Sequence, residues 1–157
     1  MKNNILFRPL PLIIAILLIP AFGQARDIPP IVSTDWLLTN LKNPKLVILD
    51  VRRVEDYREG HIPGAFNMPN SCAFNEDKTF KTKEELTAIV EAAAGKDRSA
   101  AIVTYCDMGQ CCPIWSYLMK QVLGYPNVKL YVGSMQEWTQ DTDAPVTTNN
   151  KTPKVDK

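Results

Sequence analysis

Two nearly continuous apolar runs of strand length limit the folds open to this chain. The first is Lys45-Leu46-Val47-Ile48-Leu49-Asp50-Val51, and the second runs from Ala100 to Tyr105. A strand with one face in water alternates apolar and polar residues, whereas these runs are apolar on both faces. Strands of that kind are typical of parallel sheets that helices cover on both sides.

Helical patterns and turn signals separate the strand-like runs. Strands that alternate with helices in this way form a parallel sheet. We therefore predict an α/β fold with a parallel sheet of about five strands, flanked by helices on both faces. The expected helices cover residues 35–41, 55–58, 83–94, 113–123 and 135–138; the further expected strands are a short one after Gly60-His61-Ile62-Pro63-Gly64-Ala65 and one at 128–132.

The N-terminus has the features of a secretory signal peptide. Lys2 and Arg8 precede an apolar stretch from Pro9 to Phe22, and Gly23-Gln24-Ala25 supplies the small residues of a cleavage site. That stretch is short for a membrane span, which needs about 20 residues. We expect residues 1–25 to be removed, no stable membrane anchor to remain, and the product to be periplasmic or secreted.

Cleavage near Ala25 would leave 132 of the 157 residues, which suits one domain. We predict that this domain covers residues 26–148 and that residues 149–157 form a disordered polar tail. The cleaved chain would hold 16 basic and 17 acidic residues, so nothing favours nucleic acid as a partner. The oligomeric state stays open.

Three of the four cysteines are crowded into seven positions, and the fourth is Cys72. An exported protein usually holds its cysteines in disulfides, but disulfides that stabilise a fold would be spread along the chain. The neighbours Cys111 and Cys112 are also poor partners, since a bridge between them strains the peptide. The distribution of Cys106, Cys111 and Cys112 therefore favours a reactive site.

Cys106 lies where a parallel sheet usually binds its ligand, after a buried strand and before a helix. Gly109 allows the following loop to curl, and a curled loop ahead of a helix directs N–H groups inward. An anion or a thiolate would be stabilised there. The residues alone leave two alternatives for Cys106: a nucleophile in an anion cradle, or a buried structural cysteine.

Five motifs in register resemble the rhodanese family of sulfurtransferases, and the likeness is greatest to the catalytic half of its tandem thiosulfate and mercaptopyruvate enzymes. They extend from about Ile31 to Val146 and are Leu49-Asp50-Val51-Arg52, Tyr57 with Gly60-His61-Ile62-Pro63-Gly64-Ala65-Phe66-Asn67, Cys106 with Gly109, Gly133-Ser134, and Glu137-Trp138. The resemblance implies a rhodanese-like sheet and transfer of a sulfane sulfur from thiosulfate or a related donor.

The resemblance also implies roles for individual residues. Cys106 would attack the donor and carry the sulfur as a persulfide, which a thiol or cyanide then removes. The loop that binds donor and persulfide would be Asp107, Met108, Gly109, Gln110 and Cys111. Asp50 and Arg52 would form an ion pair that supports this loop. The expected partners are a small anionic sulfur donor and a thiol acceptor or reductant; no cofactor or metal is expected.

Three residues of the loop depart from the family's pattern. Many members carry a basic residue where this chain has Asp107, whose charge would repel thiosulfate unless it points to solvent. A hydroxyl or basic residue is common at Cys111, and a small residue is common at Cys112. No arginine follows Cys106 within the turn, so phosphatase chemistry of the related dual-specificity enzymes is not expected.

The extra thiols leave several interpretations open. Cys111 or Cys112 could attack a persulfide on Cys106 as a resolving thiol, or they could only fill space. A thiol-disulfide redox protein and a Cu(I)-binding protein that use Cys106, Cys111 and Cys112 are the alternative functions. We interpret His61 as a structural histidine and Cys72 as a free surface thiol.

Overall fold

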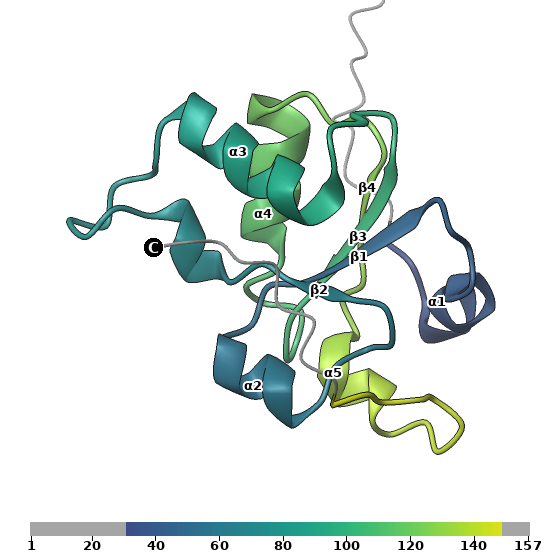
Figure 1. The fold of residues 1–157 in the computed structure, drawn as a ribbon. Coiled ribbons are helices and arrows are strands. Elements are labelled where there is room, and N and C mark those ends of the chain that lie inside the picture. Colours follow the sequence, from purple (N-terminus) through teal and green to yellow (C-terminus); the bar gives the residue numbers. More distant parts are fainter. Residues whose placement is uncertain (1–30, 149–157) are drawn as a thin grey trace, which may run out of the picture.

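The computed structural model describes residues 31–148, in which a parallel sheet lies between two layers of helices (Figure 1). The described elements, in chain order, are α1 (Thr34–Asn40), β1 (Leu46–Asp50), α2 (Val54–Glu59), β2 (Phe66–Asn67), the 3-10 helix η1 (Asn70–Ala73), α3 (Lys83–Ala94), β3 (Ala101–Tyr105), α4 (Pro113–Tyr117), the π-helix η2 (Leu118–Val122), β4 (Val128–Leu130) and α5 (Ser134–Trp138).

Within residues 31–148 the sheet has four strands in the order β2-β1-β3-β4, and every pair is parallel. The prediction of about five strands was therefore too high by one. At the outer side of β4, Ile31 makes a single parallel bridge with Leu130. The chain then turns at once into α1, because the Ser33 side chain accepts a hydrogen bond from the Trp36 N–H as the N-cap. Because α1 begins so soon after Ile31, the residues that the structure describes leave no room for a fifth strand between the bridge and the helix.

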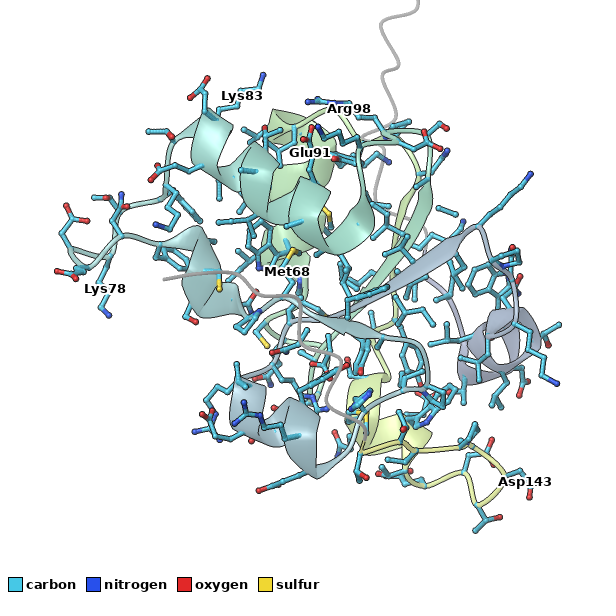
Figure 2. The ribbon with its side chains drawn as sticks, viewed as in Figure 1. Met68, Lys78, Lys83, Glu91, Arg98 and Asp143 are labelled. Carbon is cyan, nitrogen blue, oxygen red and sulfur yellow. The ribbon has the colours of Figure 1, made fainter. Side chains whose placement is uncertain are left out.

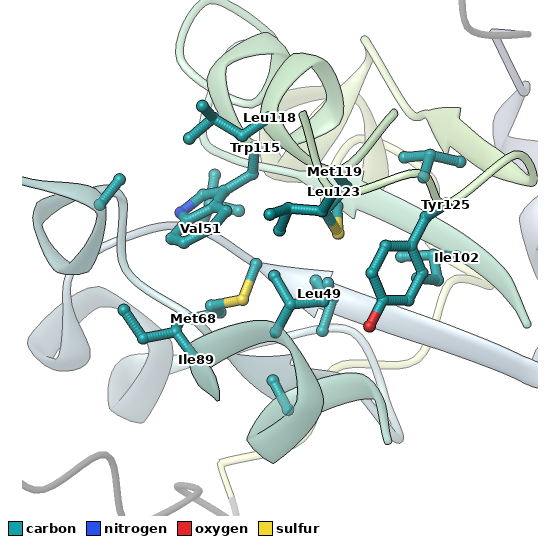
Figure 3. Packing of buried hydrophobic residues seen from close by; sticks show 14 of the residues in the cluster. Leu49, Val51, Met68, Ile89, Ile102, Trp115, Leu118, Met119, Leu123 and Tyr125 are labelled. Carbon is teal, nitrogen blue, oxygen red and sulfur yellow. The ribbon is translucent and has the colours of Figure 1, made fainter. Parts of the chain in front are cut away.

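The central strands bury apolar side chains on both faces, as the continuous runs predict. Leu49 and Ile102 point to the face that α3, α4 and η2 cover, where they pack in the cluster shown in Figure 3. Ile48 and Val103, their neighbours along the strands, belong to a second cluster with residues of α1, α2 and α5. Because side chains alternate along a strand, these two clusters confirm that helices cover both faces.

The helix ends follow the capping signals of the sequence. Thr82 caps α3 in a complete capping box with Glu85, and the helix ends at Gly95 with a φ of 82°. Pro113 occupies the first turn of α4, where a missing N–H costs nothing.

Figure 2 shows Lys83 on the outer side of the molecule and Met68 near its centre.

The predicted signal peptide at 1–25 and polar tail at 149–157 lie outside the described residues, as does the start of the predicted domain at residue 26. Among residues 31–148, no helix has the length and apolar character needed to cross a membrane.

Candidate active site around Cys106

Cys106 directly follows β3, at the carboxyl edge of the sheet. Its backbone is fixed by the start of α5, because its N–H donates to Ser134 Oγ at 3.1 Å and its carbonyl accepts from the Met135 N–H at 3.0 Å. The next carbonyl, of Asp107, accepts from the Gln136 N–H at 2.9 Å. The chain therefore leaves the sheet in a fixed direction before the loop begins.

The loop curls at Gly109, which has a φ of 76° as the sequence predicts. A Cβ at this position would lie 2.2 Å from the carbonyl oxygen of Val132. Gly109 is thus required both by its backbone angle and by the close approach of the loop to the segment after β4.

The curled loop brings three thiols together. Cys106 and Cys112 are buried, and Cys111 packs against the same cluster while partly exposed. A hydrogen bond from the Cys112 thiol outweighs the effect of burial and, with hydrogen bonds from the Cys111 thiol and from the two backbone N–H groups, lowers the pKa of Cys106 to about 4. Cys106 is therefore a thiolate at neutral pH.

The neighbouring thiols keep their protons. Burial and the hydrogen bond to Cys106 raise the pKa of Cys111 to about 12. The hydrogen bond to Cys106, together with burial, raises the pKa of Cys112 well above its usual value. The cluster thus holds one negative charge on Cys106 and two S–H donors directed at it.

Asp50 and Arg52 form a buried ion pair at the end of β1. Arg52 Nη2 lies 2.7 Å from Asp50 Oδ2 and also donates to the Gly60 carbonyl at 2.6 Å. The Tyr105 hydroxyl, one residue before the nucleophile, donates to the same carboxylate at 2.7 Å. Arg52 Nη1 reaches the loop itself at Asp107, over 3.4 Å. The pair therefore lies beneath the loop, where the resemblance placed it.

The remaining loop residues face outward. The Asp107 side chain is 58% exposed, and both Met108 and Gln110 are exposed. Met108 borders a shallow depression of about 250 Å³ between the loop and α5, whose other lining residues are Val132, Gly133, Gln136, Glu137 and Gln140. Neither Lys nor Arg occurs between Cys106 and Pro113, so the loop carries a negative charge at Asp107 and no positive one.

Two residues that the sequence analysis did not assign to the site hold its backbone. Ser134 is buried with a φ of 52°; its hydroxyl donates to the Tyr131 carbonyl at 3.0 Å and lies 3.9 Å from Cys106 Sγ. Asn70 in η1 donates from Nδ2 to the Cys111 carbonyl at 3.1 Å. Ser134 follows a neighbouring parallel strand, so its expected place at the same edge of the sheet could have assigned it to the site.

Cys72 is a free thiol, as the sequence suggested, and it is partly exposed. It lies in η1, is half-buried and packs against the cluster that contains Cys106, and burial raises the pKa of its thiol. The segment that carries it does border the site through Asn70.

His61 is structural, as expected. Its ring stacks on that of Tyr57 with centroids 3.7 Å apart, and its Nδ1 lies 2.8 Å from the Tyr57 carbonyl oxygen. No group of three or more His, Cys, Asp or Glu side chains within the described part of the chain is arranged to hold a metal ion.

A parallel sheet with a cysteine thiolate in a curled loop at its carboxyl edge is the arrangement that the resemblance led us to expect. The family model of the rhodanese-like domain matches residues 33–141. The chain therefore belongs to the rhodanese-like domain family, and the prediction of its family and fold is confirmed.

Named relatives match a large part of this chain. The chain is 42% identical over 92 residues to a putative thiosulfate sulfurtransferase 1 of Mycobacterium bovis, a match that covers 59% of this chain and 33% of the relative. It is 34% identical over 125 residues to a thiosulfate sulfurtransferase of Azotobacter vinelandii, covering 74% and 45%. The chain thus spans a third to somewhat under half of these relatives.

A solved structure of similar size shares the fold. The human single-domain sulfurtransferase TSTD1 superimposes with a TM-score of 0.55 at 25% sequence identity, and the match covers 73% of this chain and 98% of that one. The rhodanese-like domain therefore also occurs as nearly the whole of a solved chain.

Proposed function

We propose that the protein is a sulfurtransferase that moves a sulfane sulfur from thiosulfate or a related donor to a thiol or cyanide, through a persulfide on Cys106. The observation that carries the proposal is the place of Cys106 at the carboxyl edge of the sheet, where Ser134 and Met135 hold its backbone at the start of the curled loop. Hydrogen bonds from Cys112 and Cys111 lower the pKa of its thiol there to about 4. A thiolate is the form of cysteine that attacks sulfur. The sulfurtransferase names of the relatives support the same chemistry.

The reaction has two transfers. The Cys106 thiolate attacks the outer sulfur of thiosulfate, a sulfur–sulfur bond forms, and sulfite leaves with the electron pair of the bond that breaks. The anionic persulfide remains beside the inward S–H and N–H groups that stabilised the thiolate. Cyanide or a thiolate then attacks the outer sulfur, and Cys106 leaves as the thiolate with which the cycle began.

The test is the intact mass of the reduced protein before and after addition of thiosulfate, beside the Cys106→Ser variant. The expected result is release of one equivalent of sulfite by the wild type and none by the variant; the sulfur atom transferred to Cys106 remains as added mass unless a neighbouring thiol displaces it. An unchanged mass and no product from thiosulfate, from an organic persulfide or from a polysulfide would reject the proposal. Because Cys106 is 1% exposed, circular dichroism of the variant serves to confirm that the fold is kept.

We also propose that the protein acts outside the cytoplasm. The basic start, the apolar stretch and the small residues before Arg26 support cleavage after Ala25. Expression of the full chain followed by cell fractionation should place a product that begins at Arg26 in the periplasm or medium. An uncleaved product in the cytoplasm would contradict export and would leave the chemistry at Cys106 untouched.

A further inference from the structure

A sulfur atom carried by Cys106 would lie beside two further thiols. Cys106 and Cys112 are buried in one side-chain cluster, Cys111 packs against that cluster, and the Cys106 sulfur accepts hydrogen bonds from both neighbouring side chains. All four cysteines of the chain are free thiols in this structure. A thiol beside a persulfide is a reactant, because it can attack the sulfur–sulfur bond and displace sulfide.

The two neighbours of Cys106 differ in their access to solvent. Cys112 is 0% exposed, and its carbonyl accepts hydrogen bonds from the Thr104 and Ser116 hydroxyls beneath the loop. Cys111 is partly exposed, with its carbonyl held by Asn70. Of the two neighbours, Cys111 is therefore the more accessible to a reductant from solution, and Cys112 is enclosed.

Building on the proposed function, we propose that Cys111 is a resolving thiol that converts the Cys106 persulfide into a Cys106–Cys111 disulfide and releases hydrosulfide. A bond forms between the two Sγ atoms, and the bond from Cys106 Sγ to the outer sulfur breaks. The outer sulfur leaves with the electron pair and takes the proton of the Cys111 thiol. The persulfide sulfur is thereby reduced to sulfide, and the two cysteines are oxidised.

The disulfide needs two electrons from a thiol reductant to reopen it, and a dithiol supplies both in one molecule. One thiolate of the dithiol attacks the sulfur of the partly exposed Cys111, and Cys106 leaves; the second thiol then frees Cys111, so the dithiol becomes a disulfide. This direction of attack is favoured because the thiol of lower pKa leaves faster. The pKa of Cys106 is about 4 and that of Cys111 about 12. In this scheme the sulfur leaves as hydrosulfide, and the thiol partner is a reductant of the disulfide.

A mixed disulfide with a dithiol protein needs room at the rim, and the rim consists of the exposed Asp107, Met108 and Gln110 beside Cys111. The buried Cys112 keeps its proton throughout and donates it as a hydrogen bond to Cys106 whenever that sulfur leaves as a thiolate. Cys112 is therefore the hydrogen-bond donor to Cys106, and Cys111 is the thiol that reacts.

The experiment follows one turnover by intact mass and by a sulfide assay. Protein is reduced, freed of reductant and treated with thiosulfate, and in parallel with a polysulfide so that donor choice does not decide the result. The wild type should lose two hydrogens and release one equivalent of sulfide. Cys111→Ser should instead gain one sulfur atom and release no sulfide. Cys72→Ser should behave as the wild type, and Cys112→Ser should still form the disulfide.

Each other outcome has a defined meaning. A stable persulfide in both the wild type and Cys111→Ser would overturn the resolving role and leave the sulfurtransferase proposal standing. Loss of the disulfide in Cys112→Ser, with its retention in Cys111→Ser, would overturn the assignment to Cys111. A protein that neither gains sulfur in any variant nor releases sulfide would reject the proposed function together with this inference, and disulfide formation without sulfide would indicate a redox protein.

Discussion

The negative charge on Cys106 depends on the thiol of one buried neighbour. We expect the thiolate to persist from neutral pH down to about pH 5 and to be lost around pH 4, because the pKa of Cys106 is about 4 instead of the usual 9.0. The largest lowering comes from Cys112, so Cys112→Ala should move the midpoint upward, while Cys112→Ser, which keeps a donor, should move it less. Thiolate absorbance in the ultraviolet, with Cys106→Ser as baseline, measures it. A midpoint near 9 in the wild type would contradict the expectation.

The carboxylate of Asp107 sets the charge that an incoming donor meets. It is 58% exposed and has Arg52 as its ion-pair partner over 3.4 Å. Asp107→Asn removes the repulsion of thiosulfate and frees an Arg52 N–H for an anion, so kcat/KM for thiosulfate should rise by about fivefold at low salt, a Coulomb effect of about 1 kcal/mol.

The control for Asp107→Asn is Asp143→Asn, which converts another exposed carboxylate, in the segment after α5, to an amide. Salt should shrink the gain from Asp107→Asn, because exposed charges are screened. An unchanged kcat/KM, or an equal rise for both variants, would show that Asp107 plays no part in donor choice.

The curl of the loop rests on a single glycine, for which the chain offers a matched control. Gly109→Ala adds a Cβ at 2.2 Å from the Val132 carbonyl oxygen, so the loop must shift and persulfide formation should fall about a hundredfold. Gly95→Ala has a similar φ of 82° and nothing within 4 Å. It should cost about 1–2 kcal/mol of stability and leave sulfur transfer unchanged. Equal losses of transfer in the two variants would refute the role of the close contact.

The elements show what local sequence can and cannot predict. Helix α3 was predictable because each of its ends carries a local signal: Thr82 and Glu85 form the capping box at its start, and Gly95 ends it. The strand count was not, because a fifth strand beside β4 depends on where α1 begins to wind, and Ser33 starts it two residues after the bridge at Ile31. Local signals set the elements, while pairing at the edge depends on competition between neighbours.

The residues of the site also fall into two groups: those that a single segment of sequence predicts and those that it does not. Cys106 and Gly109 could be predicted, since the end of a buried strand and a glycine in a turn are visible in one segment. The roles of Ser134 and Asn70 could not be read from one segment, because their hydrogen bonds to Cys106 and Cys111 join parts of the chain that are 28 and 41 residues apart. Long-range polar contacts of this kind leave no periodic pattern in the sequence.

At the scale of the whole molecule, the reactive loop is held by the ends of several distant segments. The start of α5 holds its first residues, η1 holds Cys111, and the Asp50–Arg52 pair at the end of β1 joins Gly60, Tyr105 and Asp107. An ion pair that connects this many segments should influence stability as well as loop position.

Removal of Arg52 should therefore destabilise the fold in a pH-dependent way. Arg52→Met leaves the buried Asp50 carboxylate without its partner, which costs about 3–5 kcal/mol. Burial already raises the pKa of Asp50 above 3.8, and the variant loses the hydrogen bonds that oppose this rise. A carboxyl group with a raised folded-state pKa stabilises at low pH and loses that contribution as pH rises, so the deficit should grow from about pH 4 to neutrality. Chemical denaturation across this range measures it. Asp50→Asn combined with Arg52→Met should remove the pH dependence, and a deficit that is constant with pH would contradict the assignment.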